Sequence, residues 1–123
     1  MEKGPKISDA EWEVMKVVWD HAPMTATEVL DLLPHDQWKQ KTVNTFLARL
    51  EQKGVIESQR EGRANVYSCL LSEGECRRTE GSHFLSKVFR GKVAPMMLHF
   101  IENEELSDDE LDELRAILDR KAK

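Results

Sequence analysis

Apolar residues recur at intervals of three and four positions along much of the chain, which is the spacing of one face of an α-helix. The first such stretch follows Ser8 and Glu11, whose separation is that of a capping box at a helix N-terminus. We expect a core-facing helix that runs to about Asp20 and ends at residues 21–23. Its apolar positions are Trp12, Val14, Met15, Val18 and Trp19.

A second capping box, formed by Thr25 and Glu28, predicts a short helix that continues through Leu33. Pro34 ends it, since proline cannot continue a helix beyond this point. Its apolar set is Val29, Leu30, Leu32 and Leu33.

The third helical stretch, residues 38–54, has two different faces. Gly54 is the expected C-terminal stop, and the apolar stripe consists of Val43, Phe46, Leu47 and Leu50. The other face is polar, and the charges nearest its N-terminus, Lys39 and Lys41, are positive. Helix N-termini normally favour Asp and Glu because the helix dipole is positive there. This reversal indicates an anionic partner outside the helix.

The polar face also contains the residue types that read DNA. Asn pairs with adenine, the Thr methyl group contacts the thymine methyl, and Arg or Lys contacts guanine or phosphate. We therefore interpret residues 38–54 as a recognition helix, in which Lys39 and Arg49 hold the backbone. The expected base-reading residues are Lys41, Thr42, Asn44 and Thr45. An ordinary amphipathic helix with a solvated polar face is the alternative.

A change of period follows the third helix. Residues 55–67 are interrupted by Glu61-Gly62, which predicts a β-hairpin with Arg60 and Arg63 at its tip. A hairpin directly after a recognition helix is a wing, and its arginines are expected to reach the DNA backbone or the minor groove. Solvated turn charges are the alternative interpretation of these arginines.

Three further helices are predicted beyond residue 71. The first begins at the capping-box spacing of residues 72–75 and ends near Gly91, the second spans 93–101, and the third begins at the capping-box spacing of residues 107–110. So small a module buries its apolar faces poorly by itself, so we expect a second copy of the chain to cover them. The expected dimerisation residues are Phe84, Leu85, Val88, Phe89, Leu111, Leu114, Ile117 and Leu118. Folding back of this segment onto the same chain is the alternative.

The predicted fold class is mainly α with a small β-wing. A winged helix-turn-helix DNA-binding domain is expected over residues 1–71 and a three-helix dimerisation domain over residues 72–123. The second short helix then supports the third against the DNA groove.

Charge distribution agrees with a local DNA contact. The 123-residue chain has a net charge of −5, yet residues 39–63 hold six Lys or Arg against three Asp or Glu, and residues 101–123 hold four against nine. The two cysteines, Cys69 and Cys76, are too few for a disulfide framework, and there is no signal peptide or long apolar run. We expect a cytoplasmic protein without membrane insertion.

Other function classes fit the sequence less well. The four histidines lie in different segments and adjoin no nucleophile in a catalytic pattern, so an enzyme is not expected. Cys76 and His83 could share a helix face, but metal sites usually need three or four ligands, so no metal and no cofactor are expected. A metal- or redox-responsive repressor of the same fold, or a protein-interaction module without DNA binding, are the alternatives.

Three segments resemble the penicillinase repressor family (BlaI/MecI type), and the resemblance spans nearly the whole chain. They are Ile7-Ser8-Asp9-Ala10-Glu11-Trp12-Glu13-Val14-Met15, Lys41-Thr42-Val43-Asn44-Thr45-Phe46-Leu47-Ala48-Arg49-Leu50 with Lys53-Gly54, and Leu98-His99-Phe100 followed by Glu104-Glu105-Leu106-Ser107 and Glu113-Leu114. The resemblance implies a homodimeric winged-helix repressor of an inverted-repeat, palindromic operator in double-stranded DNA. It also implies release by proteolytic cleavage after a membrane sensor-protease pathway detects a β-lactam, and hence a role in antibiotic resistance.

The chain departs from the family pattern at three places. Family members commonly carry Arg at the position of Asn44, and Asn is expected to shift base preference toward adenine and to weaken the salt dependence of binding. The bond corresponding to the cleavage site of relatives is His99-Phe100 here, in place of the usual Asn-Phe. The cysteine-rich C-terminal motif of copper-responsive relatives is absent, so a thiolate copper site is not expected.

Overall fold

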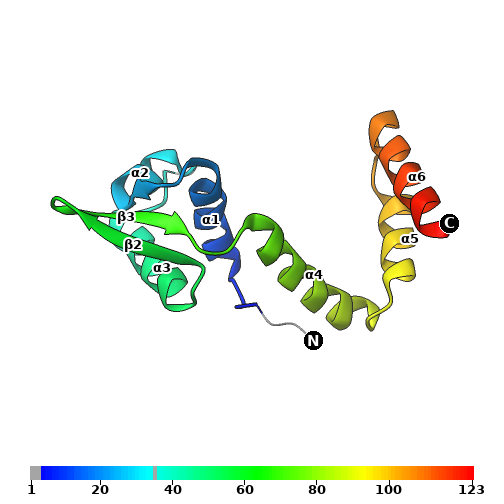
Figure 1. Ribbon diagram of the computed structural model, residues 1–123, viewed down its shortest axis with the longest axis horizontal. Coiled ribbons are helices and arrows are strands. Elements are labelled where there is room, and N and C mark those ends of the chain that lie inside the picture. Colours follow the sequence, from blue (N-terminus) through cyan, green and yellow to red (C-terminus); the bar gives the residue numbers. More distant parts are fainter. Residues whose placement is uncertain (1–3, 35) are drawn as a thin grey trace. The chain divides into compact units, whose positions relative to one another are not determined.

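The computed structural model describes residues 4–34 and 36–123, which form helices and one three-stranded antiparallel sheet (Figure 1). This confirms the expected fold class. The elements, in chain order, are α1 (Asp9–His21), β1 (Met24–Thr25), α2 (Ala26–Leu32), α3 (Gln40–Gln52), β2 (Ile56–Glu61), β3 (Ala64–Cys69), α4 (Glu73–Phe89), α5 (Val93–Asn103) and α6 (Asp108–Ala122).

Each predicted capping box is formed. At α1 the Ser8 amide donates to Glu11 Oε1 (2.9 Å) and the Glu11 amide donates to Ser8 Oγ (3.2 Å). The same reciprocal bonds begin α2, α4 and α6. Because each box satisfies two amides that the helix itself leaves without partners, the sequence defines these helix starts locally.

The sheet has the strand order β1-β3-β2, and β2 and β3 form the predicted hairpin. Gly62 at its turn has a φ of 61°, a left-handed conformation that glycine adopts without steric cost. Figure 1 shows the hairpin projecting beyond the helices α1 to α3. Strand β1, which pairs Met24 with Tyr67, was not predicted, since two residues are too short to show a strand pattern.

The winged-helix core lies between α1, α2, α3 and the sheet. The completely buried side chains include Met15, Val29, Leu47, Leu50 and Ile56. Leu32 on α2, which was expected in the apolar set of this helix, is not buried and exposes 47% of its surface. α2 is only seven residues long, and it presents Val29 and the adjacent Leu33 to the core in place of Leu32.

The chain divides into two compact units, one ending at His83 and one spanning residues 84–123. This boundary between the compact units lies within α4. The first turns of α4 belong with the winged helix because Cys76 is buried in its core.

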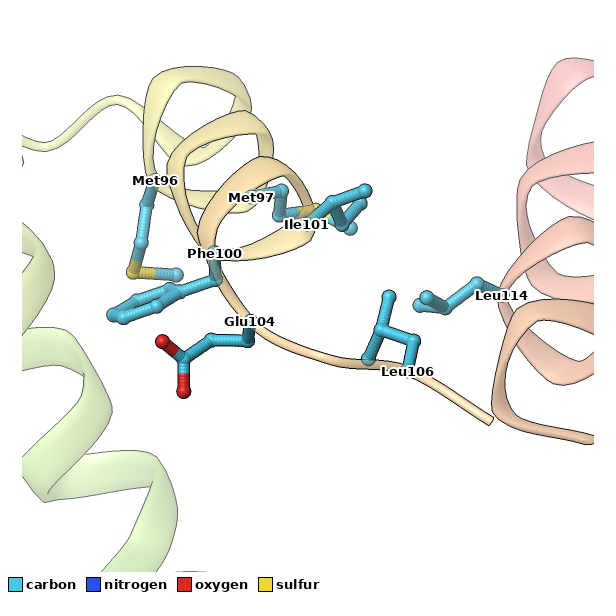
Figure 2. A pocket seen from close by; sticks show the side chains of 7 residues that line it. All are labelled: Met96, Met97, Phe100, Ile101, Glu104, Leu106 and Leu114. Carbon is cyan, nitrogen blue, oxygen red and sulfur yellow. The ribbon is translucent and has the colours of Figure 1, made fainter. Parts of the chain in front are cut away.

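The unit of residues 84–123 has no buried residue. Its α5 and α6 border an open apolar hollow of about 310 Å³ lined by Met96, Met97, Phe100, Ile101, Glu104, Leu106 and Leu114 (Figure 2). In Figure 2, Ile101 extends from α5 and Leu114 from α6 into the space between the two helices, and Leu106 on the connecting segment lies beside Leu114. These helices therefore hold apolar side chains that a single chain leaves accessible to solvent.

Candidate nucleic-acid interface

Helix α3 is fixed in the winged-helix unit by its apolar stripe. Val43, Leu47 and Leu50 are completely buried, and Phe46 is half-buried, in agreement with the predicted stripe. Lys39 occupies the N-cap position, where its ammonium group cannot accept a hydrogen bond from the helix amides, and the residue is exposed to solvent. The remaining residues of the helix are exposed or half-buried.

An ion pair between buried Glu11 and partly exposed Lys53 fixes the C-terminal end of α3. Lys53 Nζ donates to Glu11 Oε1 (2.6 Å) and to the carbonyl oxygen of Lys6 (2.8 Å). Burial opposes ionisation of Glu11, but its bonds to Lys53 and Ser8 outweigh burial and lower its pKa below the ordinary value. The start of α1 and the end of the candidate recognition helix are thus joined by a charged contact.

All eight expected DNA-binding residues are exposed to solvent. Six lie on or beside α3 and two on the hairpin: Lys39, Lys41, Thr42, Asn44, Thr45, Arg49, Arg60 and Arg63. Thr42 and Asn44 border two different hollows of α3.

On the side facing the wing, Asn44 and Arg63 line one polar hollow of about 280 Å³. Thr25 and Thr27, at the start of α2, and Asn65 on β3 border it as well. The structure therefore brings the amide of Asn44 on α3 and the guanidinium of Arg63 in the hairpin together across a space that is open to solvent. These side chains offer both donors and acceptors to a polar ligand.

On the side facing α1, Thr42 borders a different hollow, which Trp38 and Phe46 make largely aromatic. The Arg49 guanidinium lies 5.7 Å from the centre of the Phe46 ring, within the range of a cation–π contact. Phe46 thus helps to hold Arg49 in place, and Arg49 remains exposed to solvent.

Thr45 and Arg60 are oriented by local hydrogen bonds. Thr45 Oγ1 donates to the Lys41 carbonyl oxygen (3.0 Å), so the hydroxyl proton is used within the helix. Its methyl group and its free lone pairs remain available outside. Arg60 Nε donates to the Gly62 carbonyl oxygen (3.3 Å), which ties this arginine to the turn of the wing.

Gln40, which the sequence analysis did not select, contacts one of the predicted base-reading residues. Its Nε2 donates to the Ala26 carbonyl oxygen (3.1 Å) and to Asn44 Oδ1 (3.0 Å). A Gln and an Asn four residues apart on a helix form such a pair readily, so the spacing held a signal. The contact with Ala26 depends on the packing of α2 and could not be predicted from α3 alone.

The expected dimerisation residues lie on α4 and α6 and are exposed or half-buried. Val88 and Leu118 each expose 51% of their surface. The Phe84 and Phe89 rings lie about 6 Å from the Phe100 ring of α5, with centroid distances of 6.1 and 6.3 Å. His99 and Phe100, the expected cleavage position, lie within α5 and are both exposed.

The two cysteines have the surroundings of core thiols. Burial raises the pKa of both thiols, and the negative charge of Glu75 raises that of Cys76 further. Thiols with a raised pKa are protonated at neutral pH and react slowly. In residues 4–34 and 36–123, no group of three His, Cys, Asp or Glu side chains is placed to hold a metal ion. No helix in these described ranges is long and apolar enough to span a membrane.

The sequence pattern of the penicillinase repressor family matches residues 7–120. The chain belongs to the penicillinase repressor family. It is 40% identical to the penicillinase repressor of Bacillus licheniformis over 120 residues, which cover 97% of this chain and 94% of the relative. It is also 34% identical to the methicillin resistance regulatory protein MecI of Mammaliicoccus sciuri over 117 residues, covering 94% and 95% of the two chains.

A solved structure of a family member contains DNA. The solution structure of the Bacillus licheniformis BlaI monomeric form in complex with the blaP half-operator is 43% identical to this chain, with a TM-score of 0.51. It covers 61% of this chain and 93% of that one. The family resemblance predicted from the sequence is confirmed. The chain is a DNA-binding transcriptional repressor with a winged-helix fold.

Proposed function

We propose that this chain acts as a homodimer that represses transcription by binding an inverted-repeat operator, with one α3 in the major groove of each half-site. The observation that carries the proposal is the exposed polar face of α3, on which Asn44 shares a hollow with Arg63 of the wing. In this arrangement α3 reads base edges while Lys39, Arg49, Arg60 and Arg63 hold phosphates or flanking grooves.

The unit of residues 84–123 supports the homodimer. Leu98, Leu118 and Val88 each expose at least half of their surface, and none of the residues in this unit is buried. Isolated leucines on a surface are ordinary, but helices whose apolar faces are all accessible normally cover them in an assembly. A second copy of the same unit offers matching faces, and a two-fold dimer fits a two-fold operator.

The complex of the relative BlaI supports an operator with two half-sites. The BlaI structure contains a monomeric form on a half-operator. A dimer of this chain would accordingly contact two half-sites separated by about one helical turn of DNA, 10 base pairs, or by a multiple of that distance.

A binding titration with footprinting on the DNA upstream of the chain's own gene tests this function. We expect a protected inverted repeat, weaker binding at higher salt, and loss of protection when Thr42 and Arg49 are changed to alanine. Alanine at Arg77, which pairs with Glu73 on α4 (3.0 Å), is the matched control and should leave protection intact. No protection at low salt would refute the function and would direct the search to a protein partner of α3.

We propose further that proteolytic cleavage within α5, at His99-Phe100, releases the repressor after a sensor-protease signal, with a β-lactam as the candidate inducer. Both residues are exposed, and α5 has no buried residue that would resist local opening. A cut there would separate α6 from the winged helix and so weaken the dimer. Full-length chain that remained intact in β-lactam-treated cells while the controlled gene was expressed would refute cleavage.

A further inference from the structure

Residues 4–8 precede α1 and form an N-terminal arm that lies against the winged-helix unit. Ile7 belongs to the buried core, with 5% of its surface exposed. The carbonyl oxygen of Lys6 accepts a hydrogen bond from Lys53 Nζ (2.8 Å), and Lys53 directly follows α3. The arm is therefore fixed to the end of the candidate recognition helix.

The first residue of the arm, Gly4, lies against α4. A methyl group added to Gly4 would overlap Thr79 Oγ1 and would lie only 3.0 Å from Thr79 Cβ. Rotation of the Thr79 side chain moves Oγ1 but not Cβ, so it does not open enough space. Pro5 follows Gly4, and a residue before proline has fewer conformations in which to turn away. Glycine is the residue that fits here without a shift of the arm or of α4.

Thr79 lies one turn beyond Cys76, on the same face of α4. Cys76 is buried in the winged-helix core, and Thr79 is half-buried. The further a contact lies along a helix, the more it limits the swing of the helix end beyond it. Since α4 continues as one helix to Phe89, the contact with Gly4 lies on the way to residues 84–123. The arm thus connects the recognition helix to the helix that leads into the second unit.

We propose that the N-terminal arm fixes the direction of α4 relative to α3, and that Gly4 is a positioning residue that makes operator binding selective for half-site spacing. The inference rests on the proposed homodimer, in which residues 84–123 of two chains associate. Each α4 then connects a recognition helix to the shared dimer, so a fixed α4 holds the two α3 helices at one separation. An extra base pair turns one half-site by about 34° around the duplex, which such a dimer cannot follow.

The test compares three DNAs: the operator located by footprinting, the same operator with one or two base pairs inserted between its half-sites, and a single half-site. The unmodified full-length chain should bind the lengthened operators more weakly than the original. Gly4→Ala should bind the original operator about three- to tenfold more weakly, because linked binding at two half-sites then depends on a looser connection. It should also lose most of its discrimination against the lengthened operators, while its affinity for the single half-site stays unchanged.

An exchange of one side-chain group across the contact identifies Thr79 as the partner of Gly4. Thr79→Ala alone removes Oγ1 and Cγ2, leaves a gap beside Gly4 and should relax the spacing selectivity as well. In the double variant the added methyl group occupies this gap, so much of the selectivity should return. The matched control is Gly74→Ala in the first turn of α4, where an added methyl group would lie 3.9 Å from its nearest atom, Ser72 Oγ. It should bind all three DNAs like the unmodified chain.

A role of the arm in stability alone would give a different result. Gly4→Ala would then lower the melting temperature and weaken binding to the half-site and to both kinds of operator by the same factor. Deletion of residues 1–5 removes the contact with Thr79 without adding an atom, and it keeps Ile7 and the carbonyl group of Lys6. This shortened chain should relax the spacing selectivity as Gly4→Ala does.

The outcomes separate this inference from the function on which it rests. Unchanged spacing selectivity in Gly4→Ala and in the shortened chain, or an equal loss of affinity for all three DNAs, overturns the positioning role and leaves the repressor intact. The same holds if the unmodified chain binds the lengthened operators as tightly as the original. An unmodified chain that binds the operator no more tightly than a single half-site overturns the proposed dimer on two half-sites, and this inference with it.

Discussion

Leu47 in the winged-helix unit has no exposed surface, whereas Leu118 in the unit of residues 84–123 exposes 51% of its surface. Both leucines belong to apolar stripes with the same helical spacing. In the first unit, three helices and a sheet close around the stripe; in the second, no residue is buried. Helical periodicity thus predicts that a face will be covered without telling whether the same chain or another one covers it.

Size accounts for much of this difference. Residues 84–123 are too few to enclose a core, because the buried fraction of a chain falls steeply with its length. The first unit has about twice as many residues and adds a sheet against which helices pack. We therefore expect the first unit to fold alone and the second to depend on association.

Truncation after His83 tests this comparison with the largest expected effect. The shortened chain should fold, because the whole winged-helix core, including Cys76, is retained. It should be monomeric and should bind the full operator about 10²- to 10⁴-fold more weakly, since linked binding at two half-sites is lost. Analytical ultracentrifugation and binding titrations would measure both properties.

The cut after His83 is chosen because a cut after Leu71 would also remove buried Cys76. A single half-site should be bound equally well by the truncated and the complete protomer. A truncated chain that still dimerises would show that the winged-helix unit contains the interface.

Local sequence signals predicted much of the fold. Some signals depend only on residues that are neighbours in the sequence, so they can be predicted from the sequence alone. They are the four capping boxes, Gly54 after α3 and the Glu61-Gly62 turn. Strand β1 and the exposure of Leu32 were missed because both depend on how α2 and β3 pack in three dimensions.

The sequence predicted which residue types belong to the candidate site. It did not predict which of these residues lie next to one another. All eight expected DNA-binding residues are exposed, but the two hollows that Thr42 and Asn44 border depend on the positions of α1 and the wing. Gln40 donates to the Ala26 carbonyl group, which lies 14 positions away in the sequence. Such tertiary contacts have no periodic signature.

Two leucine-to-alanine substitutions, one in each unit, test the stability of the two units separately. Leu47→Ala leaves a cavity in a closed core and should lower the free energy of unfolding of the winged-helix unit by about 2–5 kcal/mol at any protein concentration. Leu114→Ala removes contacts from a half-buried position and should act mainly on association. Urea unfolding at two protein concentrations would distinguish them, because only the second effect should depend on concentration. A concentration-independent loss for Leu114→Ala would mean that residues 84–123 are stable without a partner.

The smallest expected effect on stability concerns ion pairs, which differ in exposure between the two units. In the first unit the Glu11 side chain is only 2% exposed and bonds Lys53, whereas Arg115 and Asp112 in the second form a pair that is 72% exposed on both sides. Glu11→Gln should destabilise the winged helix by about 1–3 kcal/mol, less than a fully buried pair because Lys53 is one-third exposed. Glu73→Gln, which breaks the surface pair with Arg77, is the control and should cost less than about 1 kcal/mol.

The same contact gives a pH dependence with a defined sign. The pKa of Glu11 is lower in the folded chain than its ordinary value, so its ionised form stabilises the fold. That stabilisation is complete above the ordinary carboxyl pKa of about 4 and is lost as the pH falls through the lower, folded value. Thermal unfolding of the chain truncated after His83 should therefore show a steeper loss of stability on acidification than that of its Glu11→Gln variant. Parallel curves for the two proteins would mean that the pKa of Glu11 does not change on folding, and that the ionised form of Glu11 adds no stability.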